Sequence, residues 1–437
     1  MSEKNNRTSR NDILLSLIPI YIALTLFGYQ LTTTILWKIA EQNSRIVTTP
    51  FRAFMLLFSV VLIMLSIKWK IQKEQNVSYI CFCGIIILYS IKVLFDLLNA
   101  PEKADFYYET AWNYEIYIVI PSFIAITRII DKINFEETSK FIIIVVLTSL
   151  LFGIYSANIV FNQRGVERID LGENHILNAI SLGHLGGSGI LICFAEWPSN
   201  LYLKKRYLLL ILKTVSVIIS LYLIIYAASK GPIMALFLTL FIYVISLKKY
   251  SVLQSVFLFI AILCAIFFYQ PLLDYINSVS PILNDRFTDL IYNGDEGRAF
   301  LFNDAIKEFL KYPFGGGYFM IPYTGYSHNI FVDFLMTWGI EGSILFVIIS
   351  LRAIYNSTNW FKQSRKKNCI IPLLFLQYLV AANMSGNLYL NIPLILLYMI
   401  VLFYDSKKTE MDVIHAPDYD RENIEMDTIQ TPNPPIV

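Results

Sequence analysis

The sequence predicts an all-α polytopic membrane protein with about 12 transmembrane helices and one large extracytoplasmic loop that carries an amphipathic helix. Three observations lead to this fold class. Of 437 residues, 56% are hydrophobic and only 16% are charged, which does not suit a soluble surface. Apolar runs of about 20 residues, the length needed to cross the hydrocarbon core, recur along the chain. The longest interruption, residues 270–327, contains a helical pattern with one apolar stripe.

The expected spans follow one another with mostly short connections. In order, they cover residues 13–36, 51–67, 78–98, 112–130, 141–161, 175–194, 207–226, 231–247, 252–269, 329–351, 369–385 and 389–404. The first run is too long for a signal-peptide core and has no clear cleavage site, so we expect it to be retained as a helix.

The distribution of basic residues predicts the topology. If the amino terminus is cytoplasmic, every inner connection carries Lys or Arg, whereas the outer connections are sparser in cations or acidic. We therefore expect a multi-pass membrane protein with both termini on the cytoplasmic side. Residues 1–12 form a short tail, 13–404 the transmembrane domain with its outer loop at 270–327, and 405–437 a polar tail that we expect to be disordered.

Several classes of site are disfavoured by the residues present. The five cysteines lie in or beside the spans, where they behave as small apolar residues rather than as a disulfide framework. No His/Cys/carboxylate cluster has metal-ligand spacing, and no glycine-rich loop ends in Lys-Ser/Thr. Asp418 and Asp420 have an Asp-x-Asp spacing, but they lie in the polar tail. We expect no metal, no cofactor and no nucleic-acid partner.

The first group of residues that could carry chemistry is the outer connection before the sixth span. Arg164 and Arg168 lie in a short glycine-containing segment, and Glu173 follows at the mouth of the span. An arginine fork can hold phosphate oxygens by several charge-assisted hydrogen bonds. The alternative is that the two arginines are solvated loop charges.

The second group is the short outer turn between the seventh and eighth spans. Lys230 precedes Gly231 and Pro232 at an expected helix start, where the helix dipole already favours an anion. A cation and a helix terminus could together hold one phosphate. A lysine whose ammonium group snorkels to the interface is the alternative.

The third group lies in the large outer loop. Its amphipathic segment has apolar residues on one side and charged residues on the other, which predicts a helix lying along a surface. Arg298 occupies the first turn, where the dipole disfavours a cation unless an anion is bound. His328, at the entry to the tenth span, could exchange a proton near neutral pH, although a lone histidine can also be structural.

Charges and glycines inside the spans have structural interpretations. Lys92 and Asp96 are spaced i, i+4 and can neutralise each other. The sixth span contains four closely spaced glycines, which predict close helix packing. They are Gly183, Gly186, Gly187 and Gly189.

An ordered set of motifs between about residues 160 and 350 resembles the O-antigen polymerase/ligase family, which comprises Wzy-type polysaccharide polymerases and lipopolysaccharide O-antigen ligases. The set begins with Ser229-Lys230-Gly231 before an apolar span and continues with Gly297-Arg298 opening a helix. It ends with Tyr312-Pro313-Phe314-Gly315-Gly316-Gly317 and with His328-Asn329 leading to Trp338-Gly339-Ile340-Glu341-Gly342. The family usually has arginine where this chain has Lys230, so the charge is kept but the bidentate fork is lost.

The resemblance implies a protein of the bacterial cytoplasmic (inner) membrane with a GT-C-like helical bundle. It also implies a metal-independent, inverting glycosyl transfer on the outer face of that membrane. It implies that Lys230 and Arg298 bind the diphosphate of a polyprenyl-linked oligosaccharide and that His328 lies at the reacting centre. Arg164 and Arg168 fit the same basic pocket less closely. A base, either His328 or Glu173, would take the proton of the acceptor hydroxyl.

The resemblance leaves the acceptor open. A polymerase would extend another lipid-linked repeat of an O-antigen or capsular polysaccharide, and we favour it because polymerases are the more numerous members. A ligase would transfer the glycan to a terminal surface acceptor. A flippase or other transporter is the rival from another class, but no convincing internal repeat supports it. The expected partners are the lipid-linked oligosaccharide and membrane lipid, with a chain-length regulator and a flippase as further candidates.

Overall fold

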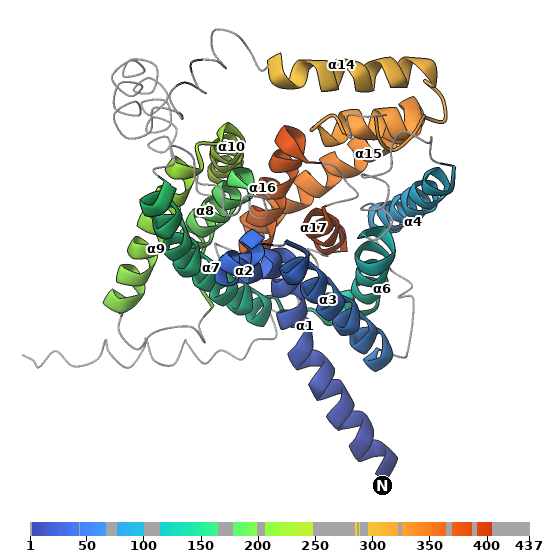
Figure 1. Ribbon diagram of the computed structural model, residues 1–437. Coiled ribbons are helices and arrows are strands. Elements are labelled where there is room, and N and C mark those ends of the chain that lie inside the picture. The colour runs from blue at the N-terminus through green and yellow to red at the C-terminus, as the bar shows by residue number, and fades with distance from the viewer. Residues whose placement is uncertain are drawn as a thin grey trace, which may run out of the picture. The chain divides into compact units, whose positions relative to one another are not determined.

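A computed structural model describes the chain as a helical membrane protein (Figure 1). The residues described are 2–42, 44–66, 77–99, 114–164, 178–198, 206–247, 285, 288, 296–321, 326–363, 369–386 and 391–403. All of them belong to one compact unit, Met1–Phe403. The predicted ninth span and the polar tail from residue 405 lie outside the described residues.

The named elements among these residues are all helices. They are α1 (Ser2–Ile35), α2 (Trp37–Gln42), α3 (Ser44–Leu65), α4 (Val77–Leu98), the π-helix η1 (Glu115–Val119), α6 (Ile120–Ile129), the 3₁₀-helix η2 (Ile130–Lys132), α7 (Phe135–Arg164), α8 (Ala179–Phe194), α9 (Arg206–Ala227), α10 (Lys230–Ser246), α14 (Glu296–Lys311), α15 (Ile330–Gln363), α16 (Ile370–Ser385) and α17 (Ile392–Phe403).

The lengths of the helices confirm a multi-pass membrane protein. In the described part of the chain, six helices are long and apolar enough to span a membrane, and they belong to α1, α3, α4, α7, α9 and α15. Four shorter apolar helices are α8, α10, α16 and α17. All ten fall on expected spans. The expected span 112–130 falls on η1 and α6, which are short, so the count of 12 and the GT-C-like arrangement stay predictions.

The last two helices form the centre of the bundle. Most residues of α16 and nearly all of α17 are buried, and α17 packs against α1, α4, α6, α15 and α16 (Figure 1). The Tyr398 hydroxyl lies 2.7 Å from Ser350 Oγ, and its ring contacts Phe82 and Phe375. By contrast, α9 exposes long apolar side chains such as Leu210, which suit contact with lipid.

The glycines of α8 allow close helix packing, as predicted. A Cβ atom on Gly186 would lie 2.7 Å from the carbonyl oxygen of Ser220 in α9, and one on Gly183 would lie 2.7 Å from Cγ of Pro232 in α10. Such distances are too short for a real side chain, so only glycine lets these backbones approach.

The glycine run after α14 inserts into a kink of α15. Gly339 interrupts α15 with φ 67° and ψ −163°. At this kink the Gly317 amide donates to the Met336 carbonyl at 2.8 Å, and the Ile340 amide donates to the Pro313 carbonyl at 3.0 Å. An isolated antiparallel bridge joins Phe314 to Gly339. The two glycine-containing motifs of the predicted site therefore bind each other.

The expected pairing of Lys92 with Asp96 is confirmed and has a third member. Lys92 Nζ lies 3.4 Å from Asp96 Oδ1, and both side chains are largely buried. The other carboxylate oxygen of Asp96 accepts the backbone amide of Phe319 at 3.0 Å. The pair thus joins the end of α4 to the segment that follows α14.

Candidate functional site

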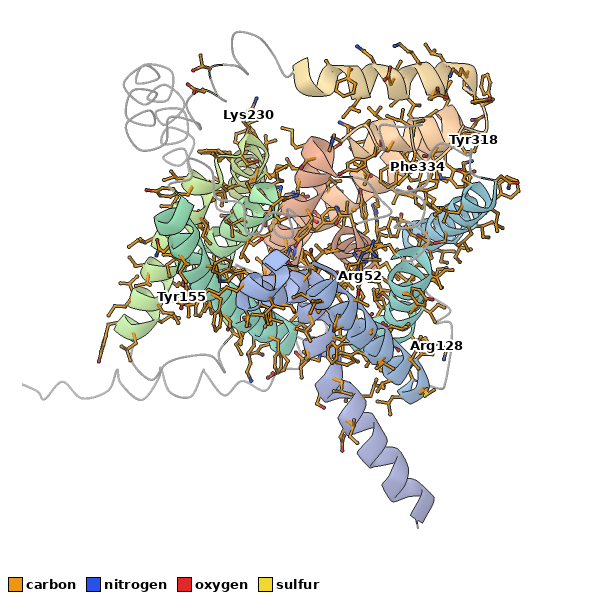
Figure 2. The ribbon with its side chains drawn as sticks, in the orientation of Figure 1. Arg52, Arg128, Tyr155, Lys230, Tyr318 and Phe334 are labelled. Atoms are coloured by element: carbon orange, nitrogen blue, oxygen red, sulfur yellow. The ribbon has the colours of Figure 1, made fainter. Side chains whose placement is uncertain are left out.

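The residues next to two predicted site residues, Lys230 and His328, lie against the carboxyl end of α16. A Cβ atom on Gly231, next to Lys230, would lie 3.6 Å from Cβ of Met384. The side-chain amide of Asn329, next to His328, donates to the carbonyl of Asn383 at 3.2 Å. Because Asn383 and Met384 are consecutive, the starts of α10 and α15 both lie next to one short segment of α16. Figure 2 shows Lys230 at the start of α10.

The turn before α10 has a strained backbone and presents an open helix start. Ala228 has a positive φ of 45° and is fully buried, and Ser229 precedes the helix without a side-chain capping hydrogen bond. Three other helices on this side of the bundle begin with an asparagine whose side-chain oxygen accepts backbone amides. They are α8 with Asn178, α15 with Asn329 and α17 with Asn391. The amides at the start of α10 are thus left for another acceptor.

Lys230 adds a positive charge to this open helix start. It is the first residue of α10 and is partly buried. Within the described parts of the chain, no carboxylate forms an ion pair with it. An uncapped helix start and a cation without an acidic partner together favour an anion such as phosphate.

The turn that carries His328 is fixed on both sides. The Ser327 amide donates to Asp333 Oδ1 at 2.8 Å, and the Ser327 hydroxyl donates to the carbonyl of Asn329 at 3.0 Å. Asn329 caps α15 by accepting the amides of Phe331 and Val332. These contacts hold His328, between them, at a φ of 62°. A positive φ is uncommon for a residue with a side chain and is found disproportionately at functional sites.

The ring of His328 has an aromatic neighbour. Its centroid lies 4.4 Å from that of Tyr326, in an edge-to-face arrangement. The residue is partly buried, and Nδ1 of its ring is among the buried atoms.

Asp333 is a site residue that the sequence analysis missed. It lies in the first turn of α15, is 4% exposed, and its Oδ2 is buried without a hydrogen-bond partner. A carboxylate at the start of an apolar span costs free energy, and on this ground Asp333 could have been singled out from the sequence. The same signal had been applied to Asp96 but not to Asp333.

A second missed group joins α8 to this part of the bundle. Gln377 donates to the carbonyl of His184 at 2.9 Å and accepts the Ser188 hydroxyl at 2.8 Å. Both ring nitrogens of His184 are buried without a hydrogen-bond partner. Gln377 lies about two turns of α16 below Asn383, so this network forms a layer deeper in the bundle.

The amphipathic helix α14 packs on the first turns of α15. Ala305 and Ile306 contact Val332 and Met336, together with Ile321. On its outer side, Lys307 pairs with Asp304 and Lys311 with Glu308. Phe302 and Leu310 of the predicted apolar stripe remain 42% and 66% exposed. The prediction of a surface-lying helix is therefore matched, with only part of its stripe covered.

The remaining predicted residues are only partly located. Arg298 lies in the first turn of α14, two residues after its start, and Arg164 is the last residue of α7. Arg168 and Glu173 lie outside the described residues. In Figure 1, α14 begins on the side of α10 and ends near α4, where Phe319 binds Asp96.

The comparison with known families covers this site. A family model described as O-antigen ligase, Wzy_C, matches residues 215–347. This match supports the resemblance of the chain to the O-antigen ligase/polymerase family. The resemblance drawn from the sequence motifs is thereby confirmed. The matched segment contains Lys230, Arg298 and His328, and also Asp333, but ends before α16, which supplies Asn383. No curated protein matches the chain.

Proposed function

We propose that this protein is a membrane glycosyltransferase that moves an oligosaccharide from a polyprenyl diphosphate onto an acceptor glycan on the extracytoplasmic side. In particular, we propose that it polymerises O-antigen or capsular repeat units. The observation that carries the proposal is that the helix starts beside Lys230 and His328, both inside the segment that matches the O-antigen ligase family, lie against the same end of α16. An anion-binding group and a proton acceptor are the two components that such a transfer requires.

The proposed donor site is the start of α10. The Lys230 ammonium group and the uncapped amides would bind one phosphate of the donor, and Arg298 on α14 would bind the other. As the bond between the anomeric carbon and the diphosphate oxygen breaks, negative charge accumulates on the leaving diphosphate. Fixed positive groups stabilise that charge more than they stabilise the bound donor, which lowers the barrier.

The proposed acceptor step uses His328. A hydroxyl oxygen of the acceptor glycan attacks the anomeric carbon on the face opposite the diphosphate, and its proton passes to the imidazole. The new glycosidic bond then has the inverted configuration. General-base assistance of this kind contributes about 10²–10⁴ in rate.

Ligation is the second candidate, because the matching family model is described as O-antigen ligase. In a ligase, the same donor chemistry delivers the glycan to a terminal acceptor. The two activities differ in the acceptor and share the donor site.

The test is to incubate the purified protein in detergent with a polyprenyl-diphosphate-linked repeat unit, without nucleotide, and to resolve the products by gel and mass spectrometry. A ladder of repeat lengths supports polymerisation. Transfer that requires an added lipid A-core acceptor supports ligation and overturns the polymerase assignment. No transfer with either acceptor, from protein that is folded by size exclusion and circular dichroism, overturns the glycosyltransferase proposal.

A further inference from the structure

The Asp333 carboxylate can accept more hydrogen bonds than the one observed. Its Oδ1 accepts the Ser327 amide at 2.8 Å, whereas Oδ2 is buried and lacks a hydrogen-bond partner. A buried polar group left without a partner costs about 1–3 kcal/mol, and more when it is charged. Such a group in an otherwise well-bonded turn calls for a functional explanation.

The neighbouring turn indicates which group could donate a hydrogen bond to Oδ2. Ser327 donates its amide to Oδ1 and is followed directly by His328. The residue bonded to the carboxylate is therefore the immediate neighbour of the histidine. Asp333 is also tied back to this turn, because its amide donates to the Asn329 carbonyl at 2.9 Å. The carboxylate and the two residues flanking the histidine therefore form one hydrogen-bonded unit.

We propose that Asp333 is the positioning residue for His328: in the reacting complex, Oδ2 accepts the N–H of one ring nitrogen and directs the other nitrogen at the acceptor hydroxyl. This inference rests on the proposed function of His328. The acceptor proton moves to the free ring nitrogen, and the ring becomes an imidazolium whose charge the Asp333 carboxylate stabilises. Asp333 stays ionised throughout, and the imidazolium later returns its proton to solvent. Fixing the tautomer in this way is a recognised role for a carboxylate beside a catalytic histidine.

Other charged groups belong to the elements packed against this turn. They include Lys230 on α10, Arg298 on α14, the Lys92–Asp96 pair on α4, and the Asp304–Lys307 and Glu308–Lys311 pairs on α14; the titratable but neutral Tyr326 lies beside the ring. The acidic members are each paired with a lysine, and Lys230 is a cation. Among the described acidic residues on these elements, Asp333 is the one with an unbonded buried oxygen next to the turn.

The test is the pH dependence of turnover in the Asp333→Asn variant. Asparagine keeps a carbonyl oxygen for the Ser327 amide but removes the negative charge. A carboxylate favours the protonated form of a neighbouring imidazole, so its loss makes the ring harder to protonate. We expect the acid limb of the rate profile to move to lower pH and the plateau to fall at least about tenfold, since general-base catalysis contributes about 10²–10⁴. A purely structural role predicts an unmoved acid limb, and this result would overturn the proposal.

Two further variants keep the outcomes distinct. Asp333→Glu retains the charge, so its acid limb should stay near that of the wild type even if its plateau falls; a limb displaced to lower pH contradicts the proposal and provides the test if Asp333→Asn does not fold. His328→Ala tests the underlying function separately. If His328→Ala turns over as fast as the wild type, the proposed role of His328 fails. If His328→Ala loses activity but the Asp333 variants keep the wild-type pH profile and plateau, the positioning role of Asp333 fails and the role of His328 stands.

Discussion

Gly317 donates its amide hydrogen to the carbonyl oxygen of Met336, the acceptor that Ile340 would use in an unbroken α-helix. Ile340 donates to Pro313 instead. The loop after α14 thus satisfies both backbone groups that the kink at Gly339 releases. Non-helical backbone at membrane depth requires such replacement because lipid provides no hydrogen bonds.

This arrangement predicts a difference between two adjacent glycines. Gly315 and Gly316 have φ values of 80° and 72°, but a Cβ on Gly316 would collide with the backbone of Thr337, whereas a Cβ on Gly315 would meet no atom within 4 Å. Gly315→Ala should therefore cost only the dihedral strain of about 1–2 kcal/mol. Gly316→Ala should cost clearly more, as measured by thermal unfolding in detergent. Equal losses for the two variants would mean that the loop does not insert at Thr337.

Replacing Lys230 should separate donor binding from folding. Lys230→Ala should lower turnover by about 10²–10³, as for loss of one group that stabilises the leaving charge, and Lys230→Arg should retain more activity. The melting temperature should change little, because no described carboxylate pairs with this lysine. Lys307→Ala, which removes a lysine with a 70% exposed side chain on α14, is the matched control and should stay active. Full activity of Lys230→Ala would remove this residue from the donor site.

Asparagine at position 328 tests chemistry without adding backbone strain. Asn tolerates a positive φ better than most residues, so His328→Asn should fold with the φ of 62° unchanged. Loss of the base should lower turnover by about 10²–10⁴. Single-turnover kinetics with a radiolabelled donor measure this loss directly. A variant that is inactive because it is unfolded would show a lowered melting temperature, which we do not expect.

The Lys92–Asp96 pair should be sensitive to loss of one member. Asp96→Ala leaves a largely buried lysine uncompensated and removes the acceptor for the Phe319 amide, so it should destabilise the protein by about 3–5 kcal/mol. The double variant Lys92→Met/Asp96→Asn removes both charges and keeps an acceptor for Phe319. It should recover most of the lost stability in denaturant unfolding. A double variant no more stable than Asp96→Ala would show that the charge pair is not the reason.

Helix packing at α8 supplies a fifth test. Gly186→Ala would place a methyl group 2.7 Å from the Ser220 carbonyl oxygen, and Gly84→Ala in α4 would meet no atom within 4 Å. The first change should separate α8 from α9 and lower the unfolding temperature. The second should be neutral or slightly stabilising, because alanine is the better helix former. Crosslinking between cysteines introduced in α8 and α9 would report the separation independently.

The sequence predicted the features that depend on local spacing. Lys92 and Asp96 are one helical turn apart, so their pairing follows from the helix alone. The bond from Asp96 to Phe319, which spans 223 residues, cannot be read from spacing because it depends on how α4 packs near α15.

The same limit applied at the site. The motifs placed Lys230 and His328 at two helix starts, but α16, against which both helix starts lie, carries no motif of its own. Asp333 was missed because its place in the sequence does not show that Oδ2 is buried without a hydrogen bond; that depends on how the His328 turn folds over the start of α15.

The insertion of the glycine run into α15 also constrains how the protein can open. Three long-range hydrogen bonds tie the segment after α14 to its surroundings: two backbone bonds to α15, and one from the Phe319 amide to the Asp96 carboxylate. A bond between neutral groups contributes about 1 kcal/mol, and one to a charged group about 1.5–3 kcal/mol. If this end of the protein moves, the amphipathic helix α14 and the turn that carries His328 should therefore move together as one rigid unit. A bulky lipid-linked glycan must therefore enter without breaking the contact between this segment and α15. If entry breaks the contact, His328 is displaced and must return to its position before each transfer.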